Sequence, residues 1–331
     1  MSETKKTKST KKTVKKVEKP AETPEVAEVS KASEPAKGTK KLLKDNPRGE
    51  YFINQYTPPF CYELAGRTFV CAMDDGLDYT LRFIDKDTVE WNFENTEPKK
   101  DKYQCLKGDD TTYLVSYELE GTAQRTNHTF VIDLENQLVT RIIARIGDNP
   151  KYPYITNSFF EFGAIRQEDG SIAFKRHSYT DEMVGTVMQW CYGQKMTTVH
   201  VYYCTNFYRI TYPRNRVQNE KDRERNDEMT AMVNSLPSSD EPATYIKIKN
   251  NMYLLNITEK NMEKLIGGKV PFRSNAMCFL QNYDHMYQVG RSFGTSTYPT
   301  GDVPTNIMFG AVGQFTEVEQ EFIDFPNPFI T

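Results

Sequence analysis

The chain has 331 residues and a formal net charge of −3 at pH 7, which is enough for two domains of ordinary size. No apolar run approaches the roughly 20 residues that a membrane-spanning helix needs, and no apolar signal segment follows the first lysines. We therefore expect a cytoplasmic protein with no membrane partner.

Residues 1–46 form a lysine-rich segment without aromatic residues. They carry a net charge of +6, so the rest of the chain carries −9. Such a segment cannot bury enough apolar surface to offset the entropy lost on ordering, and we predict a disordered arm. We expect no nucleic-acid partner, because glutamates and prolines dilute the basic run, although the positive charge leaves this question open.

The six cysteines show no C-x-x-C pair, and the four histidines show no H-x-H or H-x-x-x-H spacing. These patterns do not match a disulfide framework or a zinc site. We expect free thiols, no metal site and no bound cofactor.

From residue 66 onward, short runs rich in Val, Ile, Thr, Phe and Tyr alternate with turns. Residues 67–73 and 77–84 flank Asp74-Asp75-Gly76, a strong hairpin signal because glycine readily takes the positive φ that such turns need. Further runs of the same kind follow at 88–93, 112–119, 126–134 and 138–146. This spacing predicts an antiparallel meander.

Closing a meander into a barrel removes its exposed edges. We therefore predict an all-β fold with two tandem antiparallel barrels, at residues 47–175 and 176–314, and a tail at 315–331. Residues 51–62 contain two adjacent prolines, which a central strand would not tolerate, and we expect them to cover one end of the first barrel.

The two predicted barrels are degenerate copies of one pattern. Residues 66–73 align with 185–192, and residues 113–119 align with 253–259. Between these segments, Trp91 aligns with Tyr208 and Asn92 with Arg209. The first copy has Cys71, Met73, Asn92 and Leu119 where the second has Trp190, Tyr192, Arg209 and Glu259.

The second copy therefore holds the candidate site. Trp190 and Tyr192 share a strand face because side chains alternate along a strand. Glu259 continues the apolar face of residues 253, 255 and 257, where a carboxylate is costly unless it is paired, and we predict Arg209 as its partner. The first barrel is expected to be a structural partner filled by side chains.

Two segments near this site have their own patterns. Residues 214–243 are an insertion relative to the first copy, and the apolar spacing within them predicts a short amphipathic helix that ends before Pro237. Residues 261–271 contain Gly267-Gly268 and are expected to form a loop that could cover the barrel mouth.

The sequence resembles the molybdenum-cofactor biosynthesis F (MoaF) family. GRTFVCAMDDGLDYTLRF with VEWNF resembles the opening of its first half, and VGTVMQWCYGQKMTTVHVYY with TYIKIKNNMYLLNITEK resembles its second. The resemblance spans residues 60–296 and implies a calycin-like fold, related to the lipocalin barrels and to phenolic acid decarboxylase.

Phenolic acid decarboxylase uses two tyrosines, an arginine and a glutamate without a cofactor. The matching positions here imply catalytic roles for Tyr192, Arg209 and Glu259. Trp190 stands where the first tyrosine would be and lacks its hydroxyl, which puts the same substrate in doubt. Candidate ligand-binding residues are Trp190, His200, Tyr202 and Tyr253.

Three functions stay open. The resemblance favours a cofactor-independent lyase, decarboxylase or isomerase acting on a small aromatic or unsaturated acid in the second barrel. The alternative is a non-catalytic protein that binds a small aromatic or hydrophobic molecule, with Arg209 and Glu259 as a buried structural pair. The family name alone suggests an accessory role in molybdenum-cofactor metabolism. A homodimer is also left open.

Overall fold

The computed structural model describes residues 53–147, 156–193, 196–212, 236–261, 274–298 and 301–317. The predicted amino-terminal arm, all but residue 236 of the predicted helix before Pro237, all but residue 261 of the predicted loop, and residues 318–331 of the predicted tail lie outside these residues. The strands described are β1 to β17.

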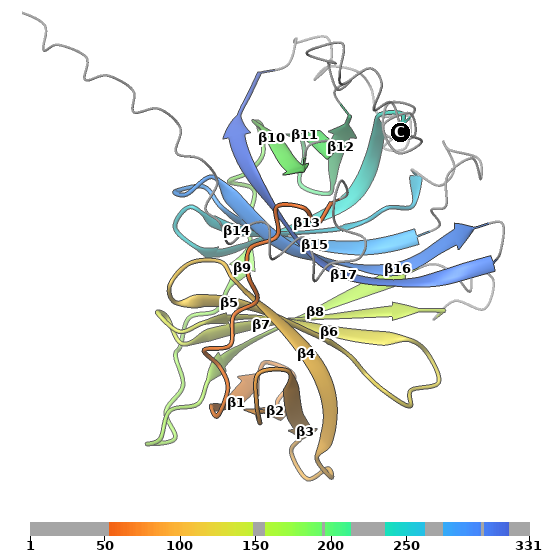
Figure 1. Ribbon diagram of the computed structural model, residues 1–331. Helices are drawn as coiled ribbons and strands as arrows, with labels where there is room; N and C mark the ends of the chain where they lie inside the picture. Colours follow the sequence, from red (N-terminus) through yellow and green to blue (C-terminus); the bar gives the residue numbers. More distant parts are fainter. Residues whose placement is uncertain are drawn as a thin grey trace, which may run out of the picture. The chain divides into compact units, whose positions relative to one another are not determined.

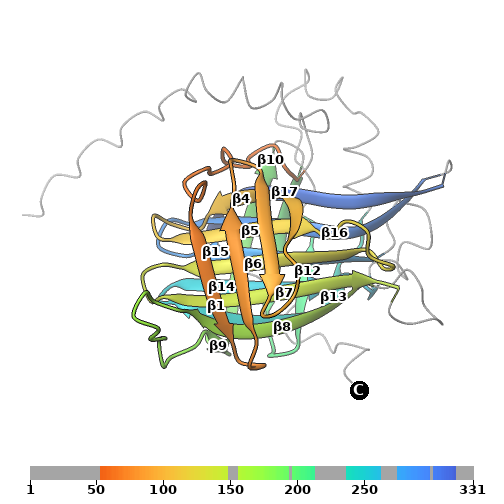
Figure 2. The same cartoon turned by 90° about the horizontal axis from the view of Figure 1, so that it is seen from below.

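The first barrel is a closed eight-stranded meander in which each strand pairs with the next and β1 pairs with β8 (Figure 1). In Figure 2 the orange strands at its start cross in front of the yellow strands of the opposite wall. Its strands are β1 (Thr68–Met73), β2 (Asp78–Phe83), β3 (Thr88–Phe93), β4 (Lys99–Lys107), β5 (Thr112–Glu118), β6 (Thr126–Asp133), β7 (Leu138–Ile146) and β8 (Thr156–Ile165).

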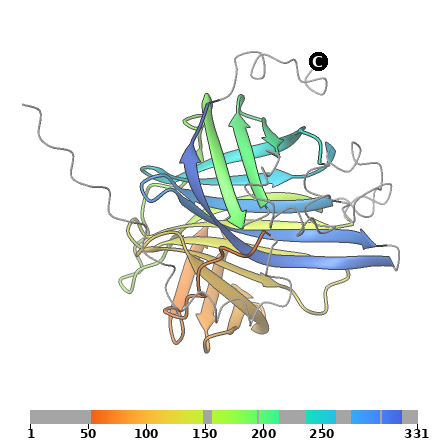
Figure 3. The same cartoon turned by 45° about the horizontal axis from the view of Figure 1, so that its top comes forward.

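The second barrel repeats this arrangement. Its strands pair in the order β10 to β17, and the ring is closed by β10 with β17 and by β12 with β13; Figure 3 shows the green strands of one wall above the cyan and blue strands. A short strand, β9 (Ser178–Tyr179), adds to β13. The strands are β10 (Thr186–Gly193), β11 (Met196–Tyr202), β12 (Phe207–Thr211), β13 (Ser239–Lys249), β14 (Met252–Thr258), β15 (Ser274–Asn282), β16 (Tyr287–Tyr298) and β17 (Gly301–Phe315).

These barrels confirm the predicted all-β fold and the internal repeat. Gly66 and Gly185 occupy matching positions before the first strand of each barrel, and both have positive φ, 81° and 90°. Cys71 and Trp190, aligned by sequence, both belong to the interior cluster of their own barrel. The sequence alignment therefore matches residues that face the barrel interior in both copies, as strand alternation requires.

The entry segment differs from its prediction, because it contacts both barrels. Ile53 packs in the interior cluster of the second barrel, and the amide of Tyr56 donates to the carbonyl of Tyr192 at 2.9 Å. The amide of Cys61 donates to the carbonyl of Cys105 in the first barrel at 2.8 Å. The start of this segment thus covers the second barrel rather than the first.

Apolar side chains on the outer faces of the two barrels form one buried cluster. Leu106, Leu114, Val131 and Ile142 come from the first barrel, and Ile246, Ile248, Met252, Leu254, Cys278, Leu280, Val289 and Met308 come from the second. Burying apolar surface of this kind stabilises the folded protein by about 25 cal/mol per Å². The two barrels therefore share a hydrophobic core in addition to the two that fill their interiors.

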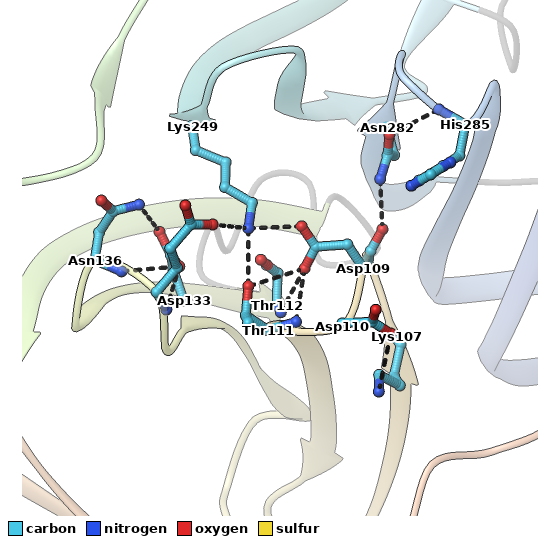
Figure 4. Close-up of polar contacts among 12 residues, drawn as sticks. Lys107, Asp109, Asp110, Thr111, Thr112, Asp133, Asn136, Lys249, Asn282 and His285 are labelled. Atoms are coloured by element: carbon cyan, nitrogen blue, oxygen red, sulfur yellow. Dashed lines mark hydrogen bonds and ion pairs between the residues drawn. The ribbon is translucent and has the colours of Figure 1, made fainter.

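A polar network crosses the same boundary. Lys249 of β13 lies 2.6 Å from Asp109 and 2.7 Å from Glu135, both in turns of the first barrel. It also donates to the hydroxyl of Thr111 at 3.0 Å (Figure 4). Only 13% of its side chain is exposed, so water screens these ion pairs less than it screens surface pairs.

Candidate functional site

The interior of the second barrel is lined mainly by aromatic side chains. Tyr202, Tyr208, Tyr245, Phe279 and Phe309 all belong to its buried cluster. They surround a smaller set of polar groups contributed by β11, β13, β14, β15 and β16. An apolar cavity wall with a few fixed polar groups is the usual composition of a small-molecule site.

Three of the predicted residues meet in this interior. The indole nitrogen of Trp190 donates to the hydroxyl of Tyr202 at 3.4 Å, and Nδ1 of His200 lies 3.3 Å from the same hydroxyl. Nε2 of His200 lies 3.0 Å from the hydroxyl of Thr198. Burial lowers the pKa of His200 to about 3, so the imidazole is neutral at pH 7.

A second hydrogen-bonded chain joins Tyr202 to Tyr192. Nε2 of Gln281 lies 2.9 Å from the Tyr202 hydroxyl and 2.9 Å from the side-chain oxygen of Gln288. Nε2 of Gln288 donates to the hydroxyl of Tyr192 at 2.7 Å. Burial raises the pKa of Tyr192 above its usual range, so its phenol stays protonated at neutral pH.

Glu259 lies where the alternation of β14 predicts, continuing the interior face beyond the end of the strand. It is 4% exposed, and its Oε2 has no hydrogen-bond partner among the described residues. Burial, and then the charge of Glu241, raise the pKa of Glu259 well above its usual value. The raised pKa favours the neutral, protonated form of this carboxyl group.

Glu241 is the second acid of this region and is fully buried. Its Oε1 accepts from the hydroxyl of Ser239 at 2.9 Å. Its Oε2 accepts from the backbone amides of Lys260 and Asn261 at 2.8 and 2.9 Å. These bonds fix the chain just after Glu259, so Glu241 positions the neutral acid and also disfavours its ionisation.

Two further buried polar atoms lack hydrogen bonds within the described chain. They are the hydroxyl of Tyr208 and Oδ1 of Asn275. Asn275 is next to Glu259, because its carbonyl accepts from the Glu259 amide at 2.9 Å. Burial, then the charge of Glu259, raise the pKa of Tyr208 well above its usual range. Such unpaired buried groups are rare in folded proteins, and each could accept or donate a hydrogen bond to a ligand.

Arg209 is not part of this interior, and the predicted Arg209–Glu259 pair is wrong. Its neighbours in sequence, Tyr208 and Ile210, point into the barrel, so strand alternation places Arg209 on the outer face. There its Nε and Nη2 bind both carboxylate oxygens of Asp240 at 2.9 and 2.8 Å. Its guanidinium carbon lies 5.9 Å from the ring of Tyr203.

Tyr253 lies on the interior face but at the far end of β14 from Glu259. Its hydroxyl donates to Glu182 at 2.9 Å, and burial raises its pKa to about 12. Six residues of strand separate the two positions, about 20 Å at the usual rise. A small ligand held by Glu259 would therefore not reach the Tyr253 hydroxyl.

The sequence analysis did not identify Tyr208, Glu241, Asn275, Gln281 or Gln288. Tyr208 could have been found, because it alternates with Ile210 and aligns with the interior Trp91. The glutamines could not, since a polar side chain on a strand carries no sign of whether it faces inward. Their hydrogen-bond partners lie on strands that are not their neighbours in the sheet, Tyr202 on β11 for Gln281 and Tyr192 on β10 for Gln288.

A surface cavity of about 390 Å³ is less suited to a ligand. Its lining is Lys107, Asp109, Asp110, Thr111, His285 and Tyr287, several of which appear in Figure 4. Lys107 already binds Glu63 at 3.0 Å, and Asp109 binds Lys249.

Two other kinds of site are absent from the part of the chain that the structure describes. It contains no cluster of three His, Cys, Asp or Glu side chains able to hold a metal ion. It also includes no helix long and apolar enough to cross a membrane.

Comparison with known proteins supports the resemblance for the first barrel. Residues 49–148 match the family model of the MoaF N-terminal domain. No curated protein matches the chain. The matched residues include β1 to β7 of the first barrel. The first barrel is thus similar to the MoaF N-terminal domain over residues 49–148, and a second barrel of eight strands follows it.

Proposed function

We propose that the second barrel binds a small neutral aromatic molecule, with Glu259 as its hydrogen-bonding anchor. The observation that carries this proposal is the buried, unpartnered Oε2 of Glu259. A neutral carboxyl group offers one donor and one acceptor to a hydroxyl or carbonyl of the ligand. The barrel fold and the MoaF domain support the broader assignment as a small-molecule-binding protein.

The charge inside the barrel favours a neutral ligand over an acid. Arg209 lies on the outer face with Asp240, and no lysine or arginine forms an ion pair with Glu259 among the described residues. A carboxylate next to the acids Glu259 and Glu241 would be desolvated without a counter-charge, which costs several kcal/mol. Tyr192, Tyr208 and Asn275 supply neutral polar groups instead.

A fluorescence titration tests binding, because each barrel contains one tryptophan. In a Trp91→Phe variant the remaining Trp190 reports on the second barrel. We expect phenol and cinnamyl alcohol to change its emission, and cinnamate to bind more weakly at pH 7. Glu259→Leu should weaken binding about tenfold, since it removes a buried hydrogen bond. The exposed Glu120, replaced by Leu, is the matched control. A Trp190 signal that no neutral probe changes would refute the proposal.

A second candidate is a cofactor-independent lyase or isomerase. It is favoured by the raised pKa of Glu259, which suits a general acid. Glu259 would donate its proton to an unsaturated carbon of the substrate and recover a proton from the substrate or from water. Glu259→Gln should then retain binding and lose turnover, measured by chromatography with hydroxycinnamic acids and their neutral alcohols. A part in molybdenum-cofactor metabolism rests on the family name and has no support from a named residue.

A further inference from the structure

The interior of the first barrel contains an arginine that the sequence analysis did not single out. Arg141 lies on β7 and is 1% exposed. Its neighbour in the alternation, Val139, belongs to the interior cluster of this barrel. The guanidinium carbon of Arg141 lies 4.6 Å from the ring centre of Tyr79 and 5.1 Å from that of Phe93. The cation thus contacts both rings, which are themselves perpendicular, with an angle of 87° between their planes.

The only carboxylate that binds Arg141 in the described chain leaves part of the guanidinium free. Glu161 lies opposite Arg141 in the pairing of β7 with β8. Its Oε2 accepts from Nε of Arg141 at 2.6 Å and also from Nη2. Nη1 is buried and has no hydrogen-bond partner among the described residues. A buried charged donor without an acceptor is costly, so this nitrogen is suited to an anionic group.

A second arginine lies on the same face, towards the end of β7. The guanidinium carbon of Arg145 lies 5.7 Å from the ring of Phe159, and Phe159 is 45% exposed. Phe159 pairs with Ile143 and Glu161 with Arg141 in the register of β7 with β8. Two carboxylates of this interior offset the charge of the two arginines, Glu161 and the buried Asp101, which accepts from the indole nitrogen of Trp91 at 2.6 Å.

Deeper in the barrel the polar groups are neutral and bonded to one another. The hydroxyl of Tyr79 lies 2.7 Å from that of Tyr117 and 3.2 Å from Nδ1 of His128. Burial, and then the charges of Arg141 and Arg145, lower the pKa of His128 well below its usual value. Arg141 and Arg145 therefore carry positive charge next to these neutral groups, and His128 adds none.

We propose that this end of the first barrel binds the carboxylate of a small aromatic acid. Nη1 of Arg141 donates to a carboxylate oxygen, and Arg145 adds the second positive charge. The ring of the ligand packs against Phe93 and Phe159. This site is independent of the one proposed for the second barrel, which lacks an interior cation among the described residues and is suited to neutral molecules.

The test uses a Trp190→Phe variant, in which Trp91 is the remaining tryptophan. Trp91 is stacked on Tyr79, with ring centres 5.7 Å apart, and Tyr79 is in turn stacked on Arg141. We expect benzoate and cinnamate to change Trp91 emission, and to bind about tenfold or more tightly than benzyl alcohol and cinnamyl alcohol. Arg141→Met should remove this preference for the acid. Arg82→Met, which changes an exposed arginine of the same barrel, should leave it intact.

Glu161→Gln gives a second test that does not depend on the folding of Arg141→Met. Removing the competing carboxylate frees the guanidinium, so acids should bind several-fold more tightly while the alcohols are unaffected. Equal affinity for acids and alcohols in the parent protein would overturn the proposal. So would an acid affinity that both Arg141→Met and Glu161→Gln leave unchanged.

Discussion

Arg209 and Asp240 face each other across β12 and β13, joined by two hydrogen bonds of 2.9 and 2.8 Å. Their side chains are only 9% and 7% exposed, so removing one charge leaves the other poorly solvated. Asp240→Asn should lower the free energy of unfolding by about 3 kcal/mol, measured by urea denaturation. Because this pair lies outside the barrel interior, binding of cinnamyl alcohol should not change. A loss of binding in a folded Asp240→Asn protein would place the pair in the site after all.

Glu259 should make the protein less stable as pH rises. Its folded-state pKa lies well above the usual 4.5, so the folded protein keeps a proton that the unfolded chain loses. The stabilisation is fully present below pH 4.5 and is lost as pH rises through the folded pKa, at up to about 1.4 kcal/mol per pH unit. Melting temperatures of the parent and Glu259→Gln proteins between pH 4.5 and 9 measure this, and the difference should shift steadily in favour of Gln. Parallel curves would show that Glu259 is ionised in the folded protein.

Gly313 gives Trp190 the space it occupies. The two residues are paired in the register of β10 with β17, and a Cβ added at Gly313 would overlap the indole ring. Gly313→Ala should therefore cost about 1–3 kcal/mol of stability and shift Trp190 emission. In the double variant with Trp190→Phe the cost of Gly313→Ala should shrink, which a double-mutant cycle measures. Additive costs would mean that the backbone of β17, rather than Trp190, resists the change.

Lys249 should matter more for stability than Lys247, two residues earlier on β13. Lys249 binds Asp109 and Glu135 of the first barrel, whereas Lys247 binds Glu182 at a more exposed site. Replacing Lys249 by Met should cost about 2 kcal/mol or more, because the partly buried Asp109 loses its cation. Lys247→Met should cost about 1 kcal/mol or less. Equal effects in chemical denaturation would contradict the structural role of the Lys249 network.

The fold could be predicted because alternation and turn chemistry agree along most strands. Asp75-Gly76 forms the predicted turn, with φ of 88° at the glycine. The strands within residues 295–306 are harder to predict from the sequence, because this polar run lacks an apolar repeat. It nevertheless extends the hairpin of β16 and β17, with Thr295 opposite Pro304 and Tyr298 opposite Gly301. Where backbone hydrogen bonds extend an existing hairpin, the added residues need not alternate between apolar and polar side chains.

The candidate site was predicted in part, and the same rule explains both the success and the error. Alternation places Glu259 inside with Leu255 and Ile257, as expected. The same alternation, applied to the interior residues Tyr208 and Ile210, predicts that Arg209 lies on the outer face and does not pair with Glu259. The partner of Arg209, Asp240, could not be inferred, because a long insertion separates β12 from β13 in the sequence and no turn residues fix their register. Arg141 could have been found from its alternation with Val139.

The hydrophobic contact between the outer faces of the two barrels has a consequence for how their interiors can diverge. In a symmetric dimer of identical barrels, every substitution appears twice, so both lumens change together. In this chain Cys71 and Trp190 occupy matching positions in separate copies, and either can be replaced while the other stays. The covalent link therefore lets the interior of each barrel change independently, while the shared apolar contact holds the two barrels together.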